Sequence, residues 1–248
     1  MAALRHVALV VRDLEQTFEF YHQIFGLQQV RHRPGRAIHL SDGYFNVALL
    51  GKRDRTPEEI KNDIEIDSAG DIGFSHFGFQ VKSLERVVSK LSHLGLTVSA
   101  RKRPQDGRFV EERINDPEGN RVDLSENGFG AVGSKGATGI SYLTIRAEKP
   151  FLLADFYHRA LGLESMPGEE GTFVLSDDDL SVKLAPSGKD RPAGLAAMGM
   201  RVSSIEAVAT ELARYDPRLT TIPDPSRNRH VPSLCDPDGN IIELVESP

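Results

Sequence analysis

LRHVALVVRDLEQTFEFYHQIFGL (residues 4–27) and ISYLTIRAEKPFLLADFYHRALGL (residues 140–163) are two versions of one stretch of sequence. Phe-Tyr-His occurs in both, and each version ends in Gly-Leu. Each begins with a short segment in which alternate residues are apolar, which is typical of a strand, and continues with apolar residues at helical spacing. The chain therefore contains the same strand–helix unit twice.

Three more matches follow in the same order along the two halves. They are LSDGYFNVALL with LSDDDLSVKLA, GFQVKSLERV with GMRVSSIEAV, and NDPEGNRVDLSE with CDPDGNIIELVE. Conserved order of this kind indicates an internal duplication. The segment ENGFGAVGSKGATG between the halves is rich in glycine and small residues, as linkers are. We predict two domains, residues 1–127 and 139–248, joined by a linker at 128–138.

A weaker repeat lies within each half, because the strand–helix pattern restarts at FSHFGFQV (residues 74–81). Every copy suggests a strand, a helix and further strands, so the pattern is βαβββ twice in each half. The first helix has Phe18, Tyr21 and Phe25 on one face. The predicted class is α+β, in which paired βαβββ modules form a curved mixed sheet around a concave site with helices outside. The acidic connection at 52–71 is predicted to be a solvent-exposed loop.

Composition excludes several classes of protein. The chain is 39% hydrophobic and 27% charged, as in soluble globular proteins, and its net charge of −6 offers no basic surface for nucleic acid. It has one cysteine, Cys235, so it forms no internal disulfide, and it has no secretory signal pattern or membrane-length apolar run. We expect a cytoplasmic protein that acts on a small molecule without nucleic acid or membrane partners, as a monomeric pseudo-dimer or a homodimer.

Three strands of the first half each carry one metal-binding residue on the face opposite their apolar residues. These residues are His6, His76 and Asp123, and a curved sheet brings such faces together around a hollow. A single histidine or aspartate is usually an ordinary surface or core residue, so the coincidence of all three carries the hypothesis. Two imidazoles and a carboxylate are the ligands of non-heme Fe(II) oxygenases. We predict a divalent-metal site that favours Fe(II) and also suits Mn, Zn or Ni.

The motifs HVALVVRDLEQTFEFYHQIFGL, HFGFQV and DPEGNRVD resemble the vicinal oxygen chelate superfamily. That superfamily includes glyoxalase I, methylmalonyl-CoA epimerase, fosfomycin and bleomycin resistance proteins, and type I extradiol dioxygenases. The resemblance covers nearly the whole chain and implies ligand positions at His6, Ala48, His76 and Asp123. Glyoxalases and epimerases have Glu or Gln where this chain has Ala48. Extradiol dioxygenases use two His and one Glu and leave that strand free, which this chain resembles with the shorter Asp123.

Extradiol dioxygenases also place a Tyr and a His beside the metal, and this chain departs from that pattern. Arg113 stands where the Tyr is expected. Arg113 either binds a carboxylate or enediolate oxygen of the substrate or pairs with Glu111 or Glu112. His39 and Tyr44 lie on a neighbouring predicted hairpin, and His39 is either an acid/base catalyst or a partly exposed strand residue. His39, Arg113 and Tyr44 are the candidate catalytic residues.

The second half has lost the ligand pattern, since the matching positions hold Tyr142, Lys183, Ala197 and Glu243. We therefore expect the metal site to lie within the first half. Three functions remain open. The leading one is an Fe(II) extradiol-type dioxygenase for a catechol-like substrate. The alternatives are a metal-dependent isomerase, epimerase or lyase acting through an enediolate, and a metal-free protein that binds a small molecule such as an antibiotic.

Overall fold

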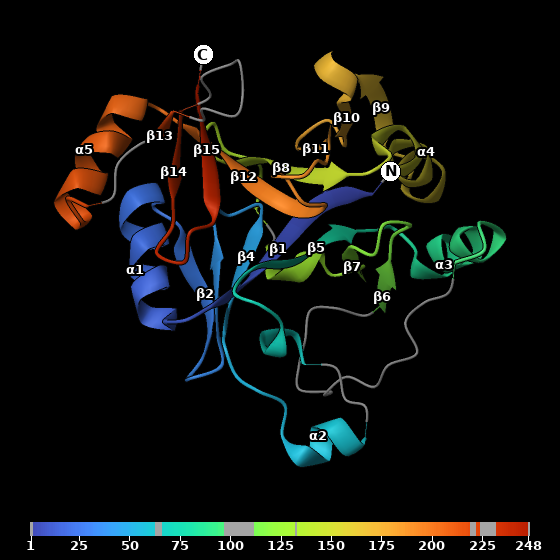
Figure 1. The fold of residues 1–248 in the computed structure, drawn as a ribbon, viewed down its shortest axis with the longest axis horizontal. Coiled ribbons are helices and arrows are strands. Elements are labelled where there is room, and N and C mark those ends of the chain that lie inside the picture. Colours follow the sequence, from blue (N-terminus) through green and yellow to red (C-terminus); the bar gives the residue numbers. More distant parts are fainter. Residues whose placement is uncertain are drawn as a thin grey trace.

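Two mixed β-sheets form the framework of the molecule (Figure 1). The computed structural model describes residues 2–62, 66–96, 112–131, 133–218, 222–223 and 232–247. Strands β1 to β7 belong to one sheet and β8 to β15 to the other, so each half of the chain supplies one sheet. The predicted α+β class with tandem sheets is confirmed.

The first sheet has the strand order β2-β3-β4-β1-β5-β7-β6. Its central strand β1 is parallel to β4, which pairs with His6 to Val11, and antiparallel to β5. In chain order the strands are β1 (Ala3–Val11), β2 (Gln28–Arg33), β3 (Ala37–Ser41), β4 (Asn46–Gly51), β5 (Gly73–Gln80), β6 (Glu112–Asn115) and β7 (Arg121–Ser125).

The second sheet repeats this arrangement, with the order β13-β14-β15-β12-β8-β11-β10-β9. Its strand β8 is parallel to β11 and antiparallel to β12, as β1 is to β4 and β5. The duplication seen in the sequence is therefore also a duplication of topology. In chain order the strands are β8 (Gly139–Ala147), β9 (Glu164–Pro167), β10 (Phe173–Ser176), β11 (Ser181–Pro186), β12 (Gly194–Val202), β13 (Ile222–Pro223), β14 (Pro232–Cys235) and β15 (Ile241–Glu246).

The four longer helices flank the sheets in two pairs, α1 with α5 and α3 with α4 (Figure 1). Their bounds are α1 (Leu14–Phe25), α3 (Leu84–His93), α4 (Pro150–Leu161) and α5 (Ile205–Tyr215), and α2 (Pro57–Lys61) is a short fifth helix. Asp13 caps α1 by accepting hydrogen bonds from the backbone of Glu15 and Gln16. The buried face of α1 consists of Thr17, Phe20, Tyr21 and Ile24. The predicted stripe is thus right for Tyr21, while Phe18 and Phe25 are only half-buried.

Each half supplies a helix tyrosine that bonds to the other half. Tyr21 of α1 donates to Asp236 Oδ2 at 3.0 Å, and Tyr157 of α4 donates to Asp116 Oδ2 at 2.7 Å. Both aspartates belong to the Asp-Pro-x-Gly-Asn turns, where each also accepts backbone N–H bonds; Asp116 takes one from Asn120. The repeated turn motif therefore organises its own hairpin and also joins the two sheets in a pseudo-symmetric way.

The connection between β4 and β5 is mostly exposed over residues 52–62, as predicted, but it is not only a loop. It contains α2 and a 3₁₀ turn, Asp67–Ala69, and that turn packs against β1 and β4. The segment lies below the first sheet in Figure 1, and its residues Asp67 and Ser68 line one cavity with His6, His76 and Asp123. The acid-rich composition of this connection predicted solvent exposure. It did not predict that residues of the connection line a cavity beside the first sheet.

None of the helices in the described ranges is long and apolar enough to cross a membrane.

Candidate metal centre

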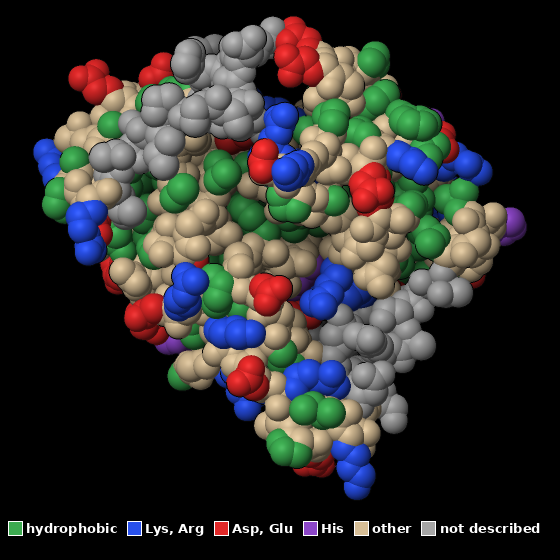
Figure 2. Space-filling view, in the orientation of Figure 1, with side chains coloured by type: hydrophobic (Ala, Val, Ile, Leu, Met, Phe, Trp, Pro, Cys, Tyr) green, Lys and Arg blue, Asp and Glu red, His purple; other side chains and the backbone are tan. Residues whose placement is uncertain are grey.

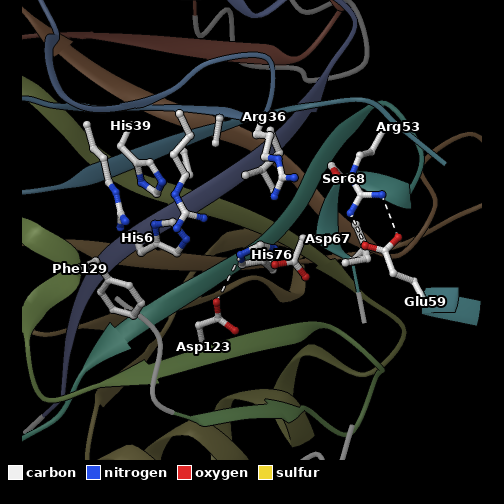
Figure 3. A pocket seen from close by; sticks show the side chains of 16 residues that line it. His6, Arg36, His39, Arg53, Glu59, Asp67, Ser68, His76, Asp123 and Phe129 are labelled. Carbon is white, nitrogen blue, oxygen red and sulfur yellow. Dashed lines mark hydrogen bonds and ion pairs between the residues drawn. The ribbon is translucent and has the colours of Figure 1, made fainter. Parts of the chain in front are cut away.

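His6, His76 and Asp123 come from three adjacent strands, β1, β5 and β7. The register pairs Gly78 of β5 with both His6 and Asp123, and His76 lies two residues before Gly78, on the same face of β5. One ligand atom from each lies within 4.8 Å of the other two. All three side chains are buried, and Figure 3 shows them converging on one point of the cavity.

Hydrogen bonds orient both histidine rings. His6 Nδ1 lies 2.9 Å from Asn46 Oδ1, and His76 Nδ1 lies 3.1 Å from Ser75 Oγ. A metal-binding histidine commonly bonds through one ring nitrogen to a protein oxygen and binds the metal through the other. The Asn46 carbonyl oxygen holds the proton of His6 on Nδ1, so Nε2 carries the lone pair that can bind a cation.

Burial and electrostatics keep the site in the form that binds metal. Burial, together with the nearby His76, lowers the pKa of His6 to about 3, so its ring is neutral at pH 7. Burial alone would raise the pKa of Asp123, but the charge of Arg113 and the nearby His76 hold it well below its usual range. One neutral imidazole and one ionised carboxylate thus need no deprotonation before a cation binds.

Arg113 lies behind the site rather than on the cavity wall. Its Nε donates to Asp123 Oδ1 at 2.5 Å and its Nη2 donates to Asp123 Oδ2 at 2.9 Å. Asp67 binds the same guanidinium through Nη1 and Nη2, and Arg113 is almost completely buried. Arg113 is therefore paired with both Asp67 and Asp123, the latter across the β6–β7 register, and Glu111 lies outside the described residues.

The donor set fits a divalent metal held by three protein ligands. His76 Nε2 and Asp123 Oδ2 are 3.3 Å apart. Two ligands that each lie about 2.1 Å from one metal are themselves about 3.0–3.4 Å apart, so this spacing suits a shared ion. Ala48 of β4 lines the cavity with only a methyl group, which provides no fourth protein ligand. The two carboxylates and one guanidinium of Asp67, Asp123 and Arg113 sum to one negative charge, which favours a cation.

The three residues open onto a cavity with a volume of about 230 Å³. Its walls come from β1, β3, β4 and β5, from the β2–β3 hairpin, and from the connection at 52–71 (Figure 3). Besides the three potential ligands and Ala48, the lining residues are Arg31, Arg33, Arg36, Ala37, His39, Leu50, Arg53, Glu59, Ile66, Asp67, Ser68 and Phe129.

His39 and Tyr44, the two candidates on the β3–β4 hairpin, have different surroundings. His39 lines the cavity with its Nδ1 at 3.3 Å from Asn46 Oδ1, and burial lowers its pKa to about 4. Tyr44 is not among the lining residues. Its hydroxyl donates to Asp179 Oδ2 at 2.5 Å, and the Arg5 guanidinium lies 3.5 Å from its ring centroid. Tyr44 therefore contacts the second half of the chain.

Phe129, Asn46 and Asp67 are site residues that the sequence reasoning missed. Phe129 lies in the predicted linker, yet its ring stacks on His6 with centroids 4.8 Å apart and planes 8° apart. A Cβ atom at position 78 would lie 2.6 Å from the Phe129 ring, so glycine at this position leaves room for that ring. The glycine of the His-Phe-Gly-Phe motif was the one available signal for this contact.

Among its described residues, the second sheet carries no comparable set. Strand register places Tyr142, Ala197 and Glu243 where the first sheet has its three potential ligands. Lys183, at the position of Ala48, lies with Nζ 3.3 Å from the Tyr142 ring centroid. In the described part of the chain, the one group of three or more His, Cys, Asp or Glu residues close enough to hold a metal ion is that of His6, His76 and Asp123.

Residues 3–124 match the family model of the Glyoxalase/Bleomycin resistance protein/Dioxygenase superfamily. The N-terminal half of the chain belongs to that superfamily, as its motifs predicted.

Two curated relatives come from Arabidopsis thaliana and match over 131 residues. Lactoylglutathione lyase GLX1 is 28% identical, and a probable chloroplastic lactoylglutathione lyase is 30% identical. Each match covers 50% of this chain, and the chain spans 44% and 35% of the length of these relatives.

Solved structures resemble nearly the whole chain. The Mn(II)-bound glyoxalase from Novosphingobium aromaticivorans aligns with a TM-score of 0.71 at 14% identity, covering 100% of this chain and 83% of its own. The 2,3-dioxygenase LapB from Pseudomonas sp. KL28 aligns with a TM-score of 0.70 at 15% identity, covering 98% and 91%. At such low identity the likeness concerns the fold alone.

Proposed function

We propose that the chain is a metal-dependent enzyme of the extradiol dioxygenase type that acts on a small catechol-like molecule. The observation that carries the proposal is the grouping of two imidazoles and one carboxylate, His6, His76 and Asp123, around a position that Ala48 leaves open. Such a set would hold Fe(II) through three protein ligands, as in non-heme Fe(II) oxygenases, and would leave the metal accessible from the cavity. A bound metal would supply Lewis acidity and a template for the vicinal oxygens.

His39 is the candidate acid/base residue. Its ring lines the cavity and is neutral at pH 7, because burial lowers its pKa to about 4. With Nδ1–H directed to Asn46 Oδ1, Nε2 is the atom that can take the proton of a catechol hydroxyl. Asn46 thus fixes the tautomers of His6 and His39 together. Arg113 positions Asp123 and takes no part in proton transfer in this proposal.

The overall reaction needs no external reductant. Both atoms of O₂ enter the product, the carbon–carbon bond beside one hydroxyl-bearing carbon breaks, and the ring opens to a carboxylate and a carbonyl. Oxygen consumption by the Fe(II)-loaded protein with a panel of substituted catechols tests the proposal. The expected result is uptake that requires both Fe(II) and a catechol and is abolished in His76→Ala. Absence of uptake with every catechol, in protein that retains iron, would overturn it.

A metal-dependent lyase is the second candidate, and it is favoured by the names of the two Arabidopsis relatives. The lack of a ligand side chain at Ala48, which has only a methyl group, counts against a four-ligand site. Formation of S-lactoylglutathione from methylglyoxal and glutathione by Zn-, Ni- or Mn-loaded protein, with no oxygen uptake on catechols, would favour the lyase. Ala48→Glu distinguishes the two functions further, because a carboxylate as fourth ligand is expected to raise metal affinity while suppressing any dioxygenase activity.

A further inference from the structure

We propose that Phe129 is a positioning residue for His6, one of the three potential metal ligands. The Phe129 ring fixes the plane of the imidazole and thereby the direction of its Nε2 atom. The inference rests on the proposed function in one respect, since it takes His6 to bind a metal ion. It goes beyond that function because it gives a role to the short 3₁₀ turn Gly128–Gly130, which follows the last strand of the first half.

Two contacts of different kinds hold the His6 ring. Its Nδ1 bonds to Asn46 Oδ1 at 2.9 Å, which fixes one atom but lets the ring pivot about that bond. The Phe129 ring lies against one face of the imidazole, with centroids 4.8 Å apart and planes 8° apart, and this contact fixes the plane. A ring that is held at one atom and along one face has a set direction for Nε2, the atom that can bind a cation.

Protein atoms rather than water surround this pair of rings. Phe129 has 1% of its surface exposed and His6 has 4%. Figure 3 shows the two rings beside each other at the cavity wall. On the face in Figure 2, histidine side chains occupy only small, separate areas of the surface, as expected when His6 and His76 are buried. Packing against protein groups therefore decides how the His6 ring is oriented.

The backbone at Phe129 has a conformation that is unfavourable for its residue type. Gly128, Phe129 and Gly130 have φ angles of 65°, 57° and 79°, so three consecutive residues are left-handed. Glycine adopts this conformation freely, whereas a bulky residue is strained in it. Such strain persists only where the surrounding structure enforces it, and it occurs often at functional sites. Glycine at position 129 would suit the turn better, so the sequence retains phenylalanine there for its ring.

The second half shows how the equivalent space is filled where no potential ligand is present. Gly78 of β5 pairs with His6 of β1, and a Cβ atom at position 78 would collide with the Phe129 ring. The equivalent glycine of β12, Gly199, pairs with Tyr142 of β8, and a Cβ atom there would collide with the Tyr142 ring itself. One large side chain thus covers the glycine in the second half. In the first half the strand position holds the smaller imidazole, and Phe129 supplies the covering ring.

The test separates the Phe129 ring from the turn that carries it. Phe129→Gly removes the ring and relieves the backbone strain. Glu170→Gly is the matched control, because Glu170 is also a left-handed residue in a short 3₁₀ turn, with φ 52°, and is exposed. The first measurement is the residual dipolar coupling of the His6 Cε1–H bond in the metal-free protein, which reports the ring orientation. Its signal is identified by its absence from His6→Gln. The second measurement is Co(II) affinity by chelator competition, with the visible spectrum of the bound Co(II).

We expect the His6 coupling to change in Phe129→Gly, because the ring is then free to pivot about its bond to Asn46. Co(II) affinity should fall about 10–100-fold with an altered visible spectrum, as when other groups that orient a metal ligand are removed. Glu170→Gly should match wild type in all three measurements. An unchanged His6 coupling, or wild-type affinity and spectrum in folded Phe129→Gly, would overturn the inference and leave the proposed function standing.

Failure of the two proposals can be told apart. A wild-type protein that binds no Co(II) would overturn the proposed function. The coupling in the metal-free protein would still decide whether Phe129 orients His6, since an altered value in Phe129→Gly supports the inference and an unaltered value overturns it. If Phe129→Gly does not fold, Phe129→Leu takes its place with the same expected outcomes, because leucine fills much of the space but has no flat face.

Discussion

Arg113 holds Asp123 through two hydrogen bonds, Nε to Oδ1 at 2.5 Å and Nη2 to Oδ2 at 2.9 Å. The two residues face each other across the antiparallel pair β6–β7, so the sheet register itself creates the contact. The arrangement fixes the carboxylate plane beside His76 Nε2. It also keeps Asp123 ionised in a fully buried position. The guanidinium is therefore a positioning group for a potential metal ligand.

Replacing Arg113 tests this role. In Arg113→Met two carboxylates, Asp67 and Asp123, lose their common cation, and loss of a buried partner costs about 3–5 kcal/mol of the free energy of unfolding. Misorientation of the ligand should weaken metal binding about 10–100-fold. Urea unfolding and chelator competition measure the two effects. Arg113→Lys is the control that keeps the positive charge but loses the planar guanidinium and its two parallel hydrogen bonds. Its stability and metal affinity should lie between those of wild type and Arg113→Met. Wild-type metal affinity in Arg113→Met would contradict the role.

Stability should depend on pH through His39. Burial lowers the folded-state pKa of His39 to about 4 from 6.5, and the charges of Arg31 and Arg33 also lower it. The unfolded chain therefore binds this proton more readily than the folded protein. The contribution to stability is complete above pH 6.5 and is lost as the pH falls towards 4. The melting temperature of the metal-free protein should fall across that range, and less steeply in His39→Gln. Parallel curves for the two proteins would argue against a buried neutral His39.

The two tyrosine–aspartate bonds should stabilise the junction between the halves. Tyr21→Phe and Tyr157→Phe each remove a hydrogen bond to a buried carboxylate, and each should lower the free energy of unfolding by about 1–3 kcal/mol. Tyr215→Phe is a matched control, because its hydroxyl bonds at an exposed site to the neutral carbonyl oxygen of Gln16. Urea unfolding should rank the control as the smallest loss. Equal losses in all three would show that burial and charge do not decide the strength of these bonds.

Gly78 should be essential for the contact between Phe129 and His6. A Cβ atom at position 78 would lie 2.6 Å from Phe129 Cζ, and overpacking of this kind costs about 1–3 kcal/mol. Gly78→Ala should therefore destabilise the wild-type protein more than it destabilises Phe129→Ala, where the ring is gone. A double-mutant cycle on unfolding free energies measures the difference. Additive effects would mean that glycine at position 78 is needed for a reason other than the room it leaves for the Phe129 ring.

The sequence predicted the fold because the duplication is expressed in strand alternation, helix spacing and the repeated Asp-Pro-x-Gly-Asn turn. It also placed His6, His76 and Asp123 on one face, because alternation assigns each strand residue to a side of the sheet. Alternation does not reveal which loop covers that side. Phe129 in the glycine-rich segment and Asp67 in the acidic connection were missed for this reason.

Register explains the remaining differences. Arg113 pairs with Asp123 because the β6–β7 alignment sets them opposite each other, a fact that composition cannot supply. Tyr44 and His39 are close in sequence, but Tyr44 lies past the end of β3 and turns to Asp179 of the other half. Two features therefore decide which residues of this hairpin face the cavity. They are the point at which the strand ends and the contacts with the second half of the chain.

Metal content is the most direct test of the central claim. Inductively coupled plasma mass spectrometry on anaerobically purified protein should find nearly one divalent metal ion per chain. The ion should be absent from His6→Ala/His76→Ala, whose folded state circular dichroism would verify. Iron would favour the dioxygenase, and zinc, nickel or manganese would favour the lyase. A wild-type protein without metal after reconstitution, or a variant that keeps the same amount as wild type, would contradict a metal site at His6, His76 and Asp123.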